Sequence, residues 1–187
     1  FPYSKHAHLF MGPLNIMASE KRRSMAAIET IDFEDEELDQ FGAAQIQHLP
    51  QTQLLDGYAC IQCSRCQDAC PAYETGKELS PSALEINKRY FINDNISTIA
   101  NGESIDKALT DWMLTEEAAW SCTTCGYCIE VCPVGNEPMI DILRARQNLV
   151  MMESNFPQDA METFEKMENY GNPVSYTHLT LPTIGCV

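Results

Sequence analysis

The chain has 187 residues, with 12 Lys and Arg against 27 Asp and Glu, which gives a formal net charge of -15 at pH 7. This length accommodates one domain, or one domain with appendages. So acidic a chain is excluded as a general nucleic-acid binder, because the phosphate backbone would repel it. No stretch approaches the roughly 20 apolar residues that a helix needs to cross a bilayer, so we expect no membrane span in this sequence.

The N-terminal part of the chain reverses its charge within a few residues. In residues 1–28 one acid, Glu20, stands against four cations: Lys5, Lys21, Arg22 and Arg23. Residues 29–39 then hold a run of acids without Lys or Arg: Glu29, Asp32, Glu34, Asp35, Glu36, Glu37 and Asp39. Such a reversal is typical of a junction. Since the chain also begins with Phe1 rather than Met, we expect residues 1–28 to be the tail of a preceding domain and residues 29–53 to be an acidic linker.

Two cysteine runs of identical spacing dominate the sequence. They are Cys60, Cys63, Cys66 and Cys70 before Pro71, and Cys122, Cys125, Cys128 and Cys132 before Pro133. Each reads C-x2-C-x2-C-x3-C-P, the ligand run of proteins that carry two [4Fe–4S] clusters. Three thiolates at this spacing reach three irons of one cubane, and the fourth ligates the other cluster. The expected ligand sets are therefore crossed: Cys60, Cys63, Cys66 and Cys132 for cluster 1, and Cys122, Cys125, Cys128 and Cys70 for cluster 2.

Two other uses of these cysteines have to be weighed. Disulfides could cross-link a small secreted domain, but all eight cysteines fall in two tight runs rather than being distributed along the chain as cross-links usually are. Zinc is the better alternative, because C-x2-C pairs are common in zinc sites. Such sites usually use two pairs separated by a longer loop, and the third cysteine of each run has no evident tetrahedral use. The spacing therefore favours iron–sulfur clusters over zinc.

Between and after the cysteine runs, the periodicity predicts helices rather than strands. A helix is expected from Ser80-Pro81, where a capping hydroxyl precedes a proline at the first helical position. Three more are expected: over Ile105–Glu117, from Pro138 to about Met152, and over Gln158–Tyr170 with Gly171 as C-cap. The side chains expected to face inward on the first two are Leu84, Ile86, Tyr90, Phe91, Leu109, Trp112 and Met113. Alternating strand patterns are scarce, so the predicted fold class is mainly α.

The C-terminal end resembles a sequencing artefact. Residues 174–183 read Val-Ser-Tyr-Thr-His-Leu-Thr-Leu-Pro-Thr. One reading frame of a transposase adapter used for sequencing libraries encodes this string. We therefore expect residues 174–187 to be adapter-derived and not part of the fold, which also removes Cys186 as a candidate ligand. The alternative is a native β-like tail.

Several segments resemble the helical ferredoxin domain of the heterodisulfide reductase C/D type, which also occurs in the anaerobic glycerol-3-phosphate dehydrogenase C subunit. They are the two cysteine runs, Gly76-Lys77-Glu78-Leu79-Ser80-Pro81, Trp120-Ser121 before the second run, and Asn169-Tyr170-Gly171-Asn172-Pro173. The resemblance implies that residues 54–173 are an α-helical ferredoxin domain with two [4Fe–4S] clusters.

Residues 1–10 resemble the segment after the last transmembrane helix in fused members of this family. In those members a nitrate-reductase-gamma-like cytochrome b domain precedes the ferredoxin domain, and cysteine-rich CCG domains follow it. The resemblance implies that residues 1–28 are a juxtamembrane tail. It also implies a place on the cytoplasmic side, attached to the inner membrane in the full-length protein.

The function implied by this resemblance is electron transfer as a module of a heterodisulfide-reductase-like, membrane-associated oxidoreductase. Its partners would be a soluble donor such as a flavoprotein, a membrane cytochrome b or quinone domain, and a CCG domain. One alternative is the iron–sulfur subunit of a soluble dehydrogenase for glycerol 3-phosphate, lactate or glycolate, and another is a zinc-binding structural module. No general acid, general base or nucleophile constellation is visible, so no catalytic residue is predicted.

Overall fold

The computed structural model describes residues 6–19, 31, 33–34 and 39–173, and within these ranges it contains helices and no strand. The predicted mainly-α fold class is therefore confirmed. In chain order the elements are α1 (His8–Ala18), the 3-10 turn η1 (Ile46–His48), α2 (Gln51–Ala59), α3 (Arg65–Asp68), α4 (Pro71–Glu74), α5 (Pro81–Asp94), α6 (Ile96–Ala100), the 3-10 turn η2 (Leu109–Asp111), α7 (Glu116–Ser121), α8 (Tyr127–Glu130), α9 (Pro138–Met151) and α10 (Gln158–Tyr170).

The chain divides into two compact units, Phe1–Glu153 and Ser154–Val187. Both cysteine runs lie in the first unit, and α10 lies in the second. The adapter-like residues 174–187 fall outside the described residues, as do residues 1–5, 20–30, 32 and 35–38 of the predicted tail and linker. The predicted division at residues 28, 53 and 173 therefore stays a prediction.

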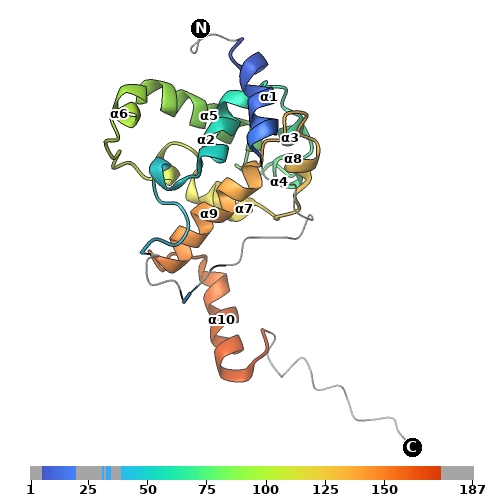
Figure 1. Cartoon of the computed structure of the whole chain (residues 1–187). Coiled ribbons are helices and arrows are strands. Elements are labelled where there is room, and N and C mark those ends of the chain that lie inside the picture. The colour runs from blue at the N-terminus through green and yellow to red at the C-terminus, as the bar shows by residue number, and fades with distance from the viewer. Residues whose placement is uncertain (1–5, 20–30, 32, 35–38, 174–187) are drawn as a thin grey trace, which may run out of the picture. The chain divides into compact units, whose positions relative to one another are not determined.

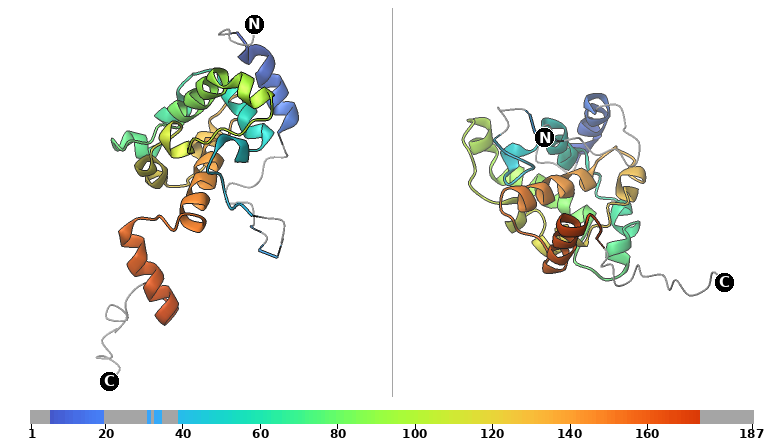
Figure 2. Two further views of the ribbon diagram at one scale, coloured as in Figure 1. Left: turned by 90° about the vertical axis from the view of Figure 1, so that its left-hand side faces the viewer. Right: turned by 90° about the horizontal axis from the view of Figure 1, so that it is seen from below.

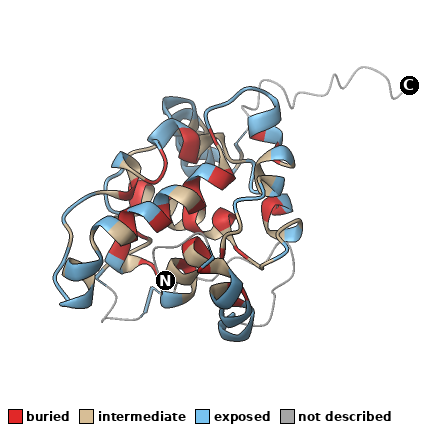
Figure 3. Cartoon of the chain, turned by 90° about the horizontal axis from the view of Figure 1, so that it is seen from above, coloured by how far each residue is buried: buried red, intermediate tan, exposed pale blue. Residues whose placement is uncertain are grey.

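The core of the first unit lies where its longer helices meet. α5 packs on α2 and on α9, α9 also packs on α7, and α1 lies along α2 (Figures 1 and 2). Figure 3 shows that the buried residues gather on the facing sides of these helices. Apolar side chains of this core include Leu79, Leu84, Phe91, Leu109, Met113 and Ile142. Their burial is the main source of stability, at about 25 cal/mol per Å² removed from water.

The two long helices of this core begin as the sequence predicts. The Ser80 hydroxyl accepts a hydrogen bond from the Ala83 N–H at 3.1 Å, and Pro81 occupies the first helical position of α5. Pro138 occupies the same position in α9. A proline there removes an N–H that no helical carbonyl would accept, which is why both helices start at these residues.

Of the four residues predicted to face inward on α5, two are buried, one is half-buried and one is exposed. Leu84 and Phe91 are buried, Ile86 is half-buried and Tyr90 is 57% exposed. At 3.6 residues per turn, seven positions bring Phe91 back to the side of Leu84, whereas six positions leave Tyr90 about 120° away. The inner face also holds the charged residues Glu85, Lys88 and Arg89, which the apolar pattern could not reveal.

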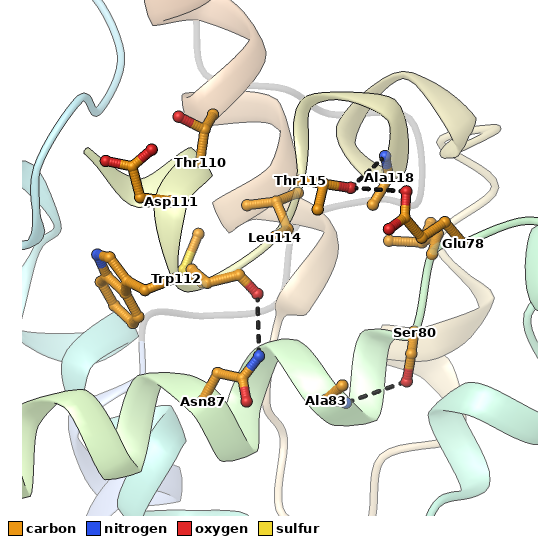
Figure 4. Close-up of a pocket in the computed structure, with 12 residues that line it drawn as sticks. Glu78, Ser80, Ala83, Asn87, Thr110, Asp111, Trp112, Leu114, Thr115 and Ala118 are labelled. Carbon is orange, nitrogen blue, oxygen red and sulfur yellow. Dashed lines mark hydrogen bonds between the residues drawn. The ribbon is translucent and has the colours of Figure 1, made fainter. Parts of the chain in front are cut away.

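Ile105–Glu117 is not the single helix that the periodicity predicts. It contains the short turn η2 and the first residues of α7, separated by non-helical backbone. Thr115 is the reason for the late start of α7: its hydroxyl accepts from the Ala118 N–H at 3.1 Å and donates to Glu78 at 3.0 Å (Figure 4). An N-capping threonine favours a helix that begins after it.

The irregular segment before α7 is nevertheless held firmly against α5. The Asn87 side chain donates to the Met113 carbonyl oxygen at 3.4 Å, beside a cavity of about 190 Å³ (Figure 4). Leu109 and Met113 are buried as predicted, and the Trp112 ring stacks on Phe91 with 3.8 Å between ring centroids. In this segment, Leu109 and Met113 are therefore buried as the sequence predicts, although the backbone is not the predicted continuous helix.

The second unit contains the predicted helix over Gln158–Tyr170, and Gly171 ends it with a φ of 64°. This left-handed conformation suits glycine, which has no Cβ to clash with the preceding turn. α10 has no buried residue, and its exposed apolar side chains are Met161, Phe164, Met167 and Tyr170.

The cap of α5 gives a first testable prediction. Ser80→Ala should lower the free energy of unfolding by about 1 kcal/mol, because the Ala83 N–H loses its acceptor. The Ser80 hydroxyl also donates to Gln67 of α3, so the loss of unfolding free energy should lie near the upper end of the range for N-cap substitutions. Urea unfolding followed by circular dichroism measures the change. Ser97→Ala, an exposed serine on α6, is the matched control, and equal stability of the two variants would contradict the prediction.

Candidate metal centres

The first cysteine run forms a tightly curled loop between α2 and α4. Cys60 is the C-cap of α2, and Cys70 is buried as the N-cap of α4 directly before Pro71. Between them Gln62 and Ser64 have positive φ values of 56° and 60°. Left-handed residues are uncommon outside glycine. Here they reverse the chain twice within five residues, so that the thiols of one short segment can face a common centre.

The second cysteine run repeats this backbone. Cys122 is the C-cap of α7, and Thr124 and Gly126 have φ values of 52° and 74°. These are the second and fourth residues after the first cysteine, the same positions as in the first run. Ser64 and Gly126 are also both the N-cap of the short helix that follows, α3 or α8. The two runs are therefore structural repeats, and not only repeats of cysteine spacing.

A cavity brings cysteines of both runs together. Its lining contains three thiols of the first run, Cys60, Cys63 and Cys66, together with Cys132 from the end of the second run and with Cys128. We call this group of Cys60, Cys63, Cys66 and Cys132 the first site. It contains the four residues that the spacing assigned to cluster 1, drawn from α2, α3 and the loop after α8. The short helices α3 and α8 pack against each other, which is what brings the two runs together.

The remaining cysteines interact around the other loop, and we call Cys70, Cys122, Cys125 and Cys128 the second site. Burial raises the pKa of Cys122 and of Cys128, and electrostatic repulsion from Cys70 and Cys125 acts in the same direction on both. Cys70 and Cys128 are buried, Cys122 is half-buried and Cys125 is exposed. The interactions thus connect the fourth cysteine of the first run with thiols of the second run.

Burial makes the thiolate form of these cysteines unfavourable without a bound cation. It raises the pKa of Cys60 to about 11, and it raises the pKa of Cys66 to about 12, with Cys132 contributing repulsion in both cases. Burial likewise raises the pKa of Cys128 to about 12. Thiolates are the ligands of iron, so a group that carries positive iron ions would relieve both the desolvation and the mutual repulsion.

The backbone supplies hydrogen bonds to two of these sulfur atoms. The Asn136 N–H donates to Cys132 Sγ at 3.3 Å, and the Thr124 N–H donates to Cys122 Sγ at 3.4 Å. Donors aimed at ligand sulfurs are a recurrent feature of iron–sulfur sites, where they stabilise the negative charge of the cluster. Four thiols on curled loops, with such donors, fit a [4Fe–4S] cluster at each site.

Within the described residues, no group of three or more His, Cys, Asp or Glu side chains is close enough together to hold a single metal ion. A cubane binds one thiolate at each of four irons, so its ligands stand further apart than those around one zinc ion.

Buried charged residues lie directly beneath the first site. Lys88 Nζ is 2.5 Å from Asp141 Oδ2 and 3.1 Å from Glu85 Oε2, and all three side chains are at most 2% exposed. Burial alone would lower the pKa of Lys88, but the carboxyl groups of Asp141, Glu85 and Asp56 outweigh it and raise that pKa. Lys88 is therefore a firmly charged cation that joins α5 to α9.

Glu85 connects this buried group to the thiols. It lines the same cavity as Cys60, Cys66 and Cys132, and burial raises the pKa of its carboxyl group. One lysine faces three carboxyl groups here, so it cannot compensate all of them at once. No pattern in the sequence points to this group, because Glu85, Lys88 and Asp141 look like ordinary polar positions of amphipathic helices.

Asp56 links the end of α2 to the second cysteine run. Its carboxylate accepts from the Asn15 side chain at 2.7 Å and from the Glu137 N–H at 3.0 Å. Its carbonyl oxygen accepts from the Asn136 side chain at 2.6 Å. Burial raises the pKa of Asp56 to about 6, against the opposing effects of Lys88 and of the Glu137 N–H. Asp56 therefore fixes the loop after Cys132 beside the first run.

Each site also has a cation: at the first site the exposed Arg65 donates to Cys63 Sγ at 3.9 Å, and at the second site the cation is Arg146. Arg146 on α9 donates from Nε to the Ala119 carbonyl oxygen at 2.8 Å and from a terminal nitrogen to the Cys122 carbonyl oxygen at 2.5 Å. Its guanidinium also lies 5.3 Å from the centre of the Trp120 ring. Burial lowers the pKa of Arg146, whereas Cys122 opposes that effect. Arg146 is thus a half-buried positive charge beside the first cysteine of the second run.

Residues 56–136, which include all eight cysteines of the two runs, match the family of 4Fe-4S dicluster domains. The chain accordingly contains a helical dicluster ferredoxin domain that holds two [4Fe–4S] clusters and serves electron transfer. The predicted cofactor is confirmed by this match. The assignment of individual cysteines to one cluster or the other stays a prediction.

Three relatives are similar over most of this chain. The "Probable iron-sulfur-binding oxidoreductase FadF" of Bacillus subtilis is 34% identical over 92% of the chain. The "EtfAB:quinone oxidoreductase" of Syntrophomonas wolfei is 30% identical over 92%, and the "Probable membrane-anchored ferredoxin" of Chromohalobacter salexigens is 25% identical over 89%. The matched part is 29%, 27% and 28% of these relatives, so the chain spans less than a third of their length.

The buried ion pair gives a second testable prediction. Lys88→Met should destabilise the loaded protein by about 3 kcal/mol or more, because Asp141 and Glu85 would lose the buried cation that contacts both of them. Lys166→Met is the matched control: Lys166 pairs with Glu162 at 3.2 Å on the exposed side of α10. The control should change stability by no more than about 0.5 kcal/mol. Anaerobic urea unfolding compares the two, and a Lys88→Met variant as stable as the control would refute the role of Lys88.

Proposed function

We propose that this chain is the electron-transferring module of a membrane-associated, heterodisulfide-reductase-like oxidoreductase. In this proposal it carries single electrons between a soluble donor such as a flavoprotein and quinone or haem. The domain lies on the cytoplasmic side of the inner membrane, beside a membrane cytochrome b or quinone domain and a CCG domain. Relatives named as an EtfAB:quinone oxidoreductase and as a membrane-anchored ferredoxin support the quinone and the membrane.

The observation that carries the proposal is the mixed lining of the first site, where Cys132 stands with Cys60, Cys63 and Cys66. We assign these four to cluster 1, and Cys70, Cys122, Cys125 and Cys128 to cluster 2. When bound, each cluster supplies a centre that accepts and gives up one electron. Because each set takes its fourth cysteine from the other run, the two centres are held as near neighbours, which favours fast transfer between them.

The side chains and backbone around each site have separate tasks in this proposal. Burial of Cys70 and Cys128 keeps water away from the ligands, and the N–H groups of Asn136 and Thr124 stabilise negative charge on Cys132 and Cys122. Arg146 places positive charge beside the second site, whereas the first site has Glu85 together with Arg65, whose guanidinium donates to Cys63 Sγ at 3.9 Å. The two sites are therefore matched in backbone and different in charge, which is a means of setting two different potentials.

The function can be tested on anaerobically purified protein. Iron and acid-labile sulfide should each approach about eight per chain, and reduction by dithionite should produce the EPR signal of reduced [4Fe–4S] clusters. A reduced electron-transferring flavoprotein should bleach the visible cluster absorbance, and a water-soluble quinone should restore it. About two zinc ions per chain without an EPR signal would overturn the iron–sulfur part. Loaded clusters that neither flavoprotein nor quinone affects would overturn the proposed partners.

The crossed ligand sets predict an unusual result for double variants. Cys60→Ala with Cys132→Ala removes two ligands of the same cluster, so about four irons per chain should remain. Cys60→Ala with Cys70→Ala removes one ligand from each cluster, so both should be lost or become labile. If each run instead bound its own cluster, the two results would be exchanged. Iron analysis and EPR read the outcome, and circular dichroism shows whether each variant is folded.

The charge of Arg146 predicts a shift of the redox potential. Arg146→Met should lower the potential of the cluster at the second site by a few tens of millivolts, because a nearby cation favours the more negative, reduced state. Arg146→Lys keeps the charge but loses the forked pair of hydrogen bonds, so its potential should stay near that of the unchanged protein. EPR-monitored redox titration measures both. Equal potentials in the Met and Lys variants would show that positioning of the loop, not charge, is what Arg146 contributes.

A further inference from the structure

Helix α1 has its polar side chain inside and its apolar side chains outside. From Leu9 to Ala18 every exposed position is apolar, with Phe10 61%, Leu14 49% and Met17 81% exposed. The buried positions of this helix are Gly12 and Asn15. This is the reverse of an ordinary surface helix, whose apolar stripe faces the core. An exposed apolar patch of this kind marks a surface that is covered in the working protein.

The inner side of α1 is fixed to the first site. Asn15 is 1% exposed, and its amide donates to Asp56 at 2.7 Å, to the Val134 carbonyl oxygen at 3.4 Å and to Asn136 at 3.5 Å. Gly12 lies against Val134. Val134 and Asn136 also line the cavity of the first site. The helix is therefore part of the cluster domain, and its apolar side points outward from a defined place in that domain.

The charge of the flanking sequence shows what could cover this face. The first 19 residues contain no Asp or Glu, although the whole chain carries a net charge of -15. In the sequence, Lys21, Arg22 and Arg23 follow this helix within five residues of its last residue, Ala18. Basic residues beside an apolar face are attracted to an anionic membrane surface.

We propose that the outward face of α1 lies in the interface of an anionic lipid bilayer and that it turns the first site, rather than the second, toward the membrane. Eleven helical residues span about 16 Å, which is too short to cross a bilayer but suits a helix lying in its surface. No helix among the described residues is long and apolar enough to cross a membrane. The inference rests on the proposed function in taking a membrane as the neighbour of the domain, and it adds the contact and the orientation.

Vesicle binding by the loaded chain tests the contact. The chain should co-sediment with vesicles of phosphatidylcholine containing phosphatidylglycerol, and binding should weaken with salt and with vesicles of phosphatidylcholine alone. The triple variant Phe10→Ser, Leu14→Ser, Met17→Ser should bind at least about tenfold more weakly, because three apolar side chains no longer enter the lipid. All three are exposed, so the fold should not depend on them.

Two matched variants make the test specific. Tyr90→Ser with Ile96→Ser removes exposed apolar side chains from α5 and α6 and should leave vesicle binding unchanged. Phe164→Ser with Met167→Ser removes the apolar side of α10, which is the strongest rival surface. Loss of binding in the α10 variant, with normal binding in the α1 variant, would overturn the proposal. So would an α1-dependent dimer, seen by analytical ultracentrifugation, in a chain that does not bind vesicles.

Fluorescence tests the orientation. Phe10→Trp should be quenched by lipids brominated on the acyl chain, whereas Tyr90→Trp should not be. A water-soluble paramagnetic relaxant should then enhance the relaxation of the EPR signal from the first site less when the chain is bound to vesicles than when it is in solution. The difference between the two conditions should be smaller for the signal from the second site. Equal changes at both sites would overturn the orientation. A chain that carries its clusters but does not bind vesicles would refute this inference and leave the proposed function standing. A chain that binds vesicles but takes up no iron would refute the proposed function and leave this inference standing.

Discussion

Two cysteine runs that are far apart in sequence can serve one pair of clusters only if the fold holds them side by side, and in this domain buried charge does much of that holding. Lys88 joins α5 to Asp141 on α9, and Asp56 at the end of α2 receives the backbone and side-chain N–H groups that follow Cys132. Each contact spans segments on either side of the cysteine loops. Apolar packing of α2, α5 and α9 surrounds these contacts, but it is less directional. The positions of the thiols therefore depend on polar groups that are expensive to bury and costly to remove.

The sequence predicts the chemistry better than the supporting structure. The eight cysteines, the caps at Ser80 and Gly171 and the prolines that open α5 and α9 act through local geometry, which a short stretch of sequence reveals. Lys88, Glu85 and Asp141 could not be recognised, because a charged residue on a helix is buried only when its partner on another helix is in place. Thr115 delays the start of α7 to Glu116 for a local reason, its hydrogen bond as N-cap, which the apolar periodicity over Ile105–Glu117 concealed. The inverted polarity of α1 likewise depends on Asp56 and Asn136, far along the chain.

The two sites show how one backbone design can be given two environments. Left-handed residues at equivalent positions curl both loops, with Ser64 in one and Gly126 in the other. One difference lies in the runs themselves, where Arg65 contacts Cys63 Sγ and Tyr127 stands at the equivalent place in the second run. Others come from the helices beneath them: α5 contributes the carboxyl group of Glu85 at the first site, and α9 contributes the guanidinium of Arg146 at the second. Evolution can therefore change the electrostatics of one site through a helix residue without altering the loop that binds the metal.

The mixed lining of the first cavity also bears on how such a protein is made. Cys132 leaves the ribosome long after Cys60, Cys63 and Cys66, so under the crossed assignment the first cluster cannot acquire its full set of ligands until most of the domain has been synthesised. Neither half of the domain is self-sufficient, and a truncated product would present incomplete sites to the iron-delivery machinery. Insertion of the two cofactors would then act as a late checkpoint in biosynthesis, since a stable loaded domain forms only from a chain that has been translated through its second run.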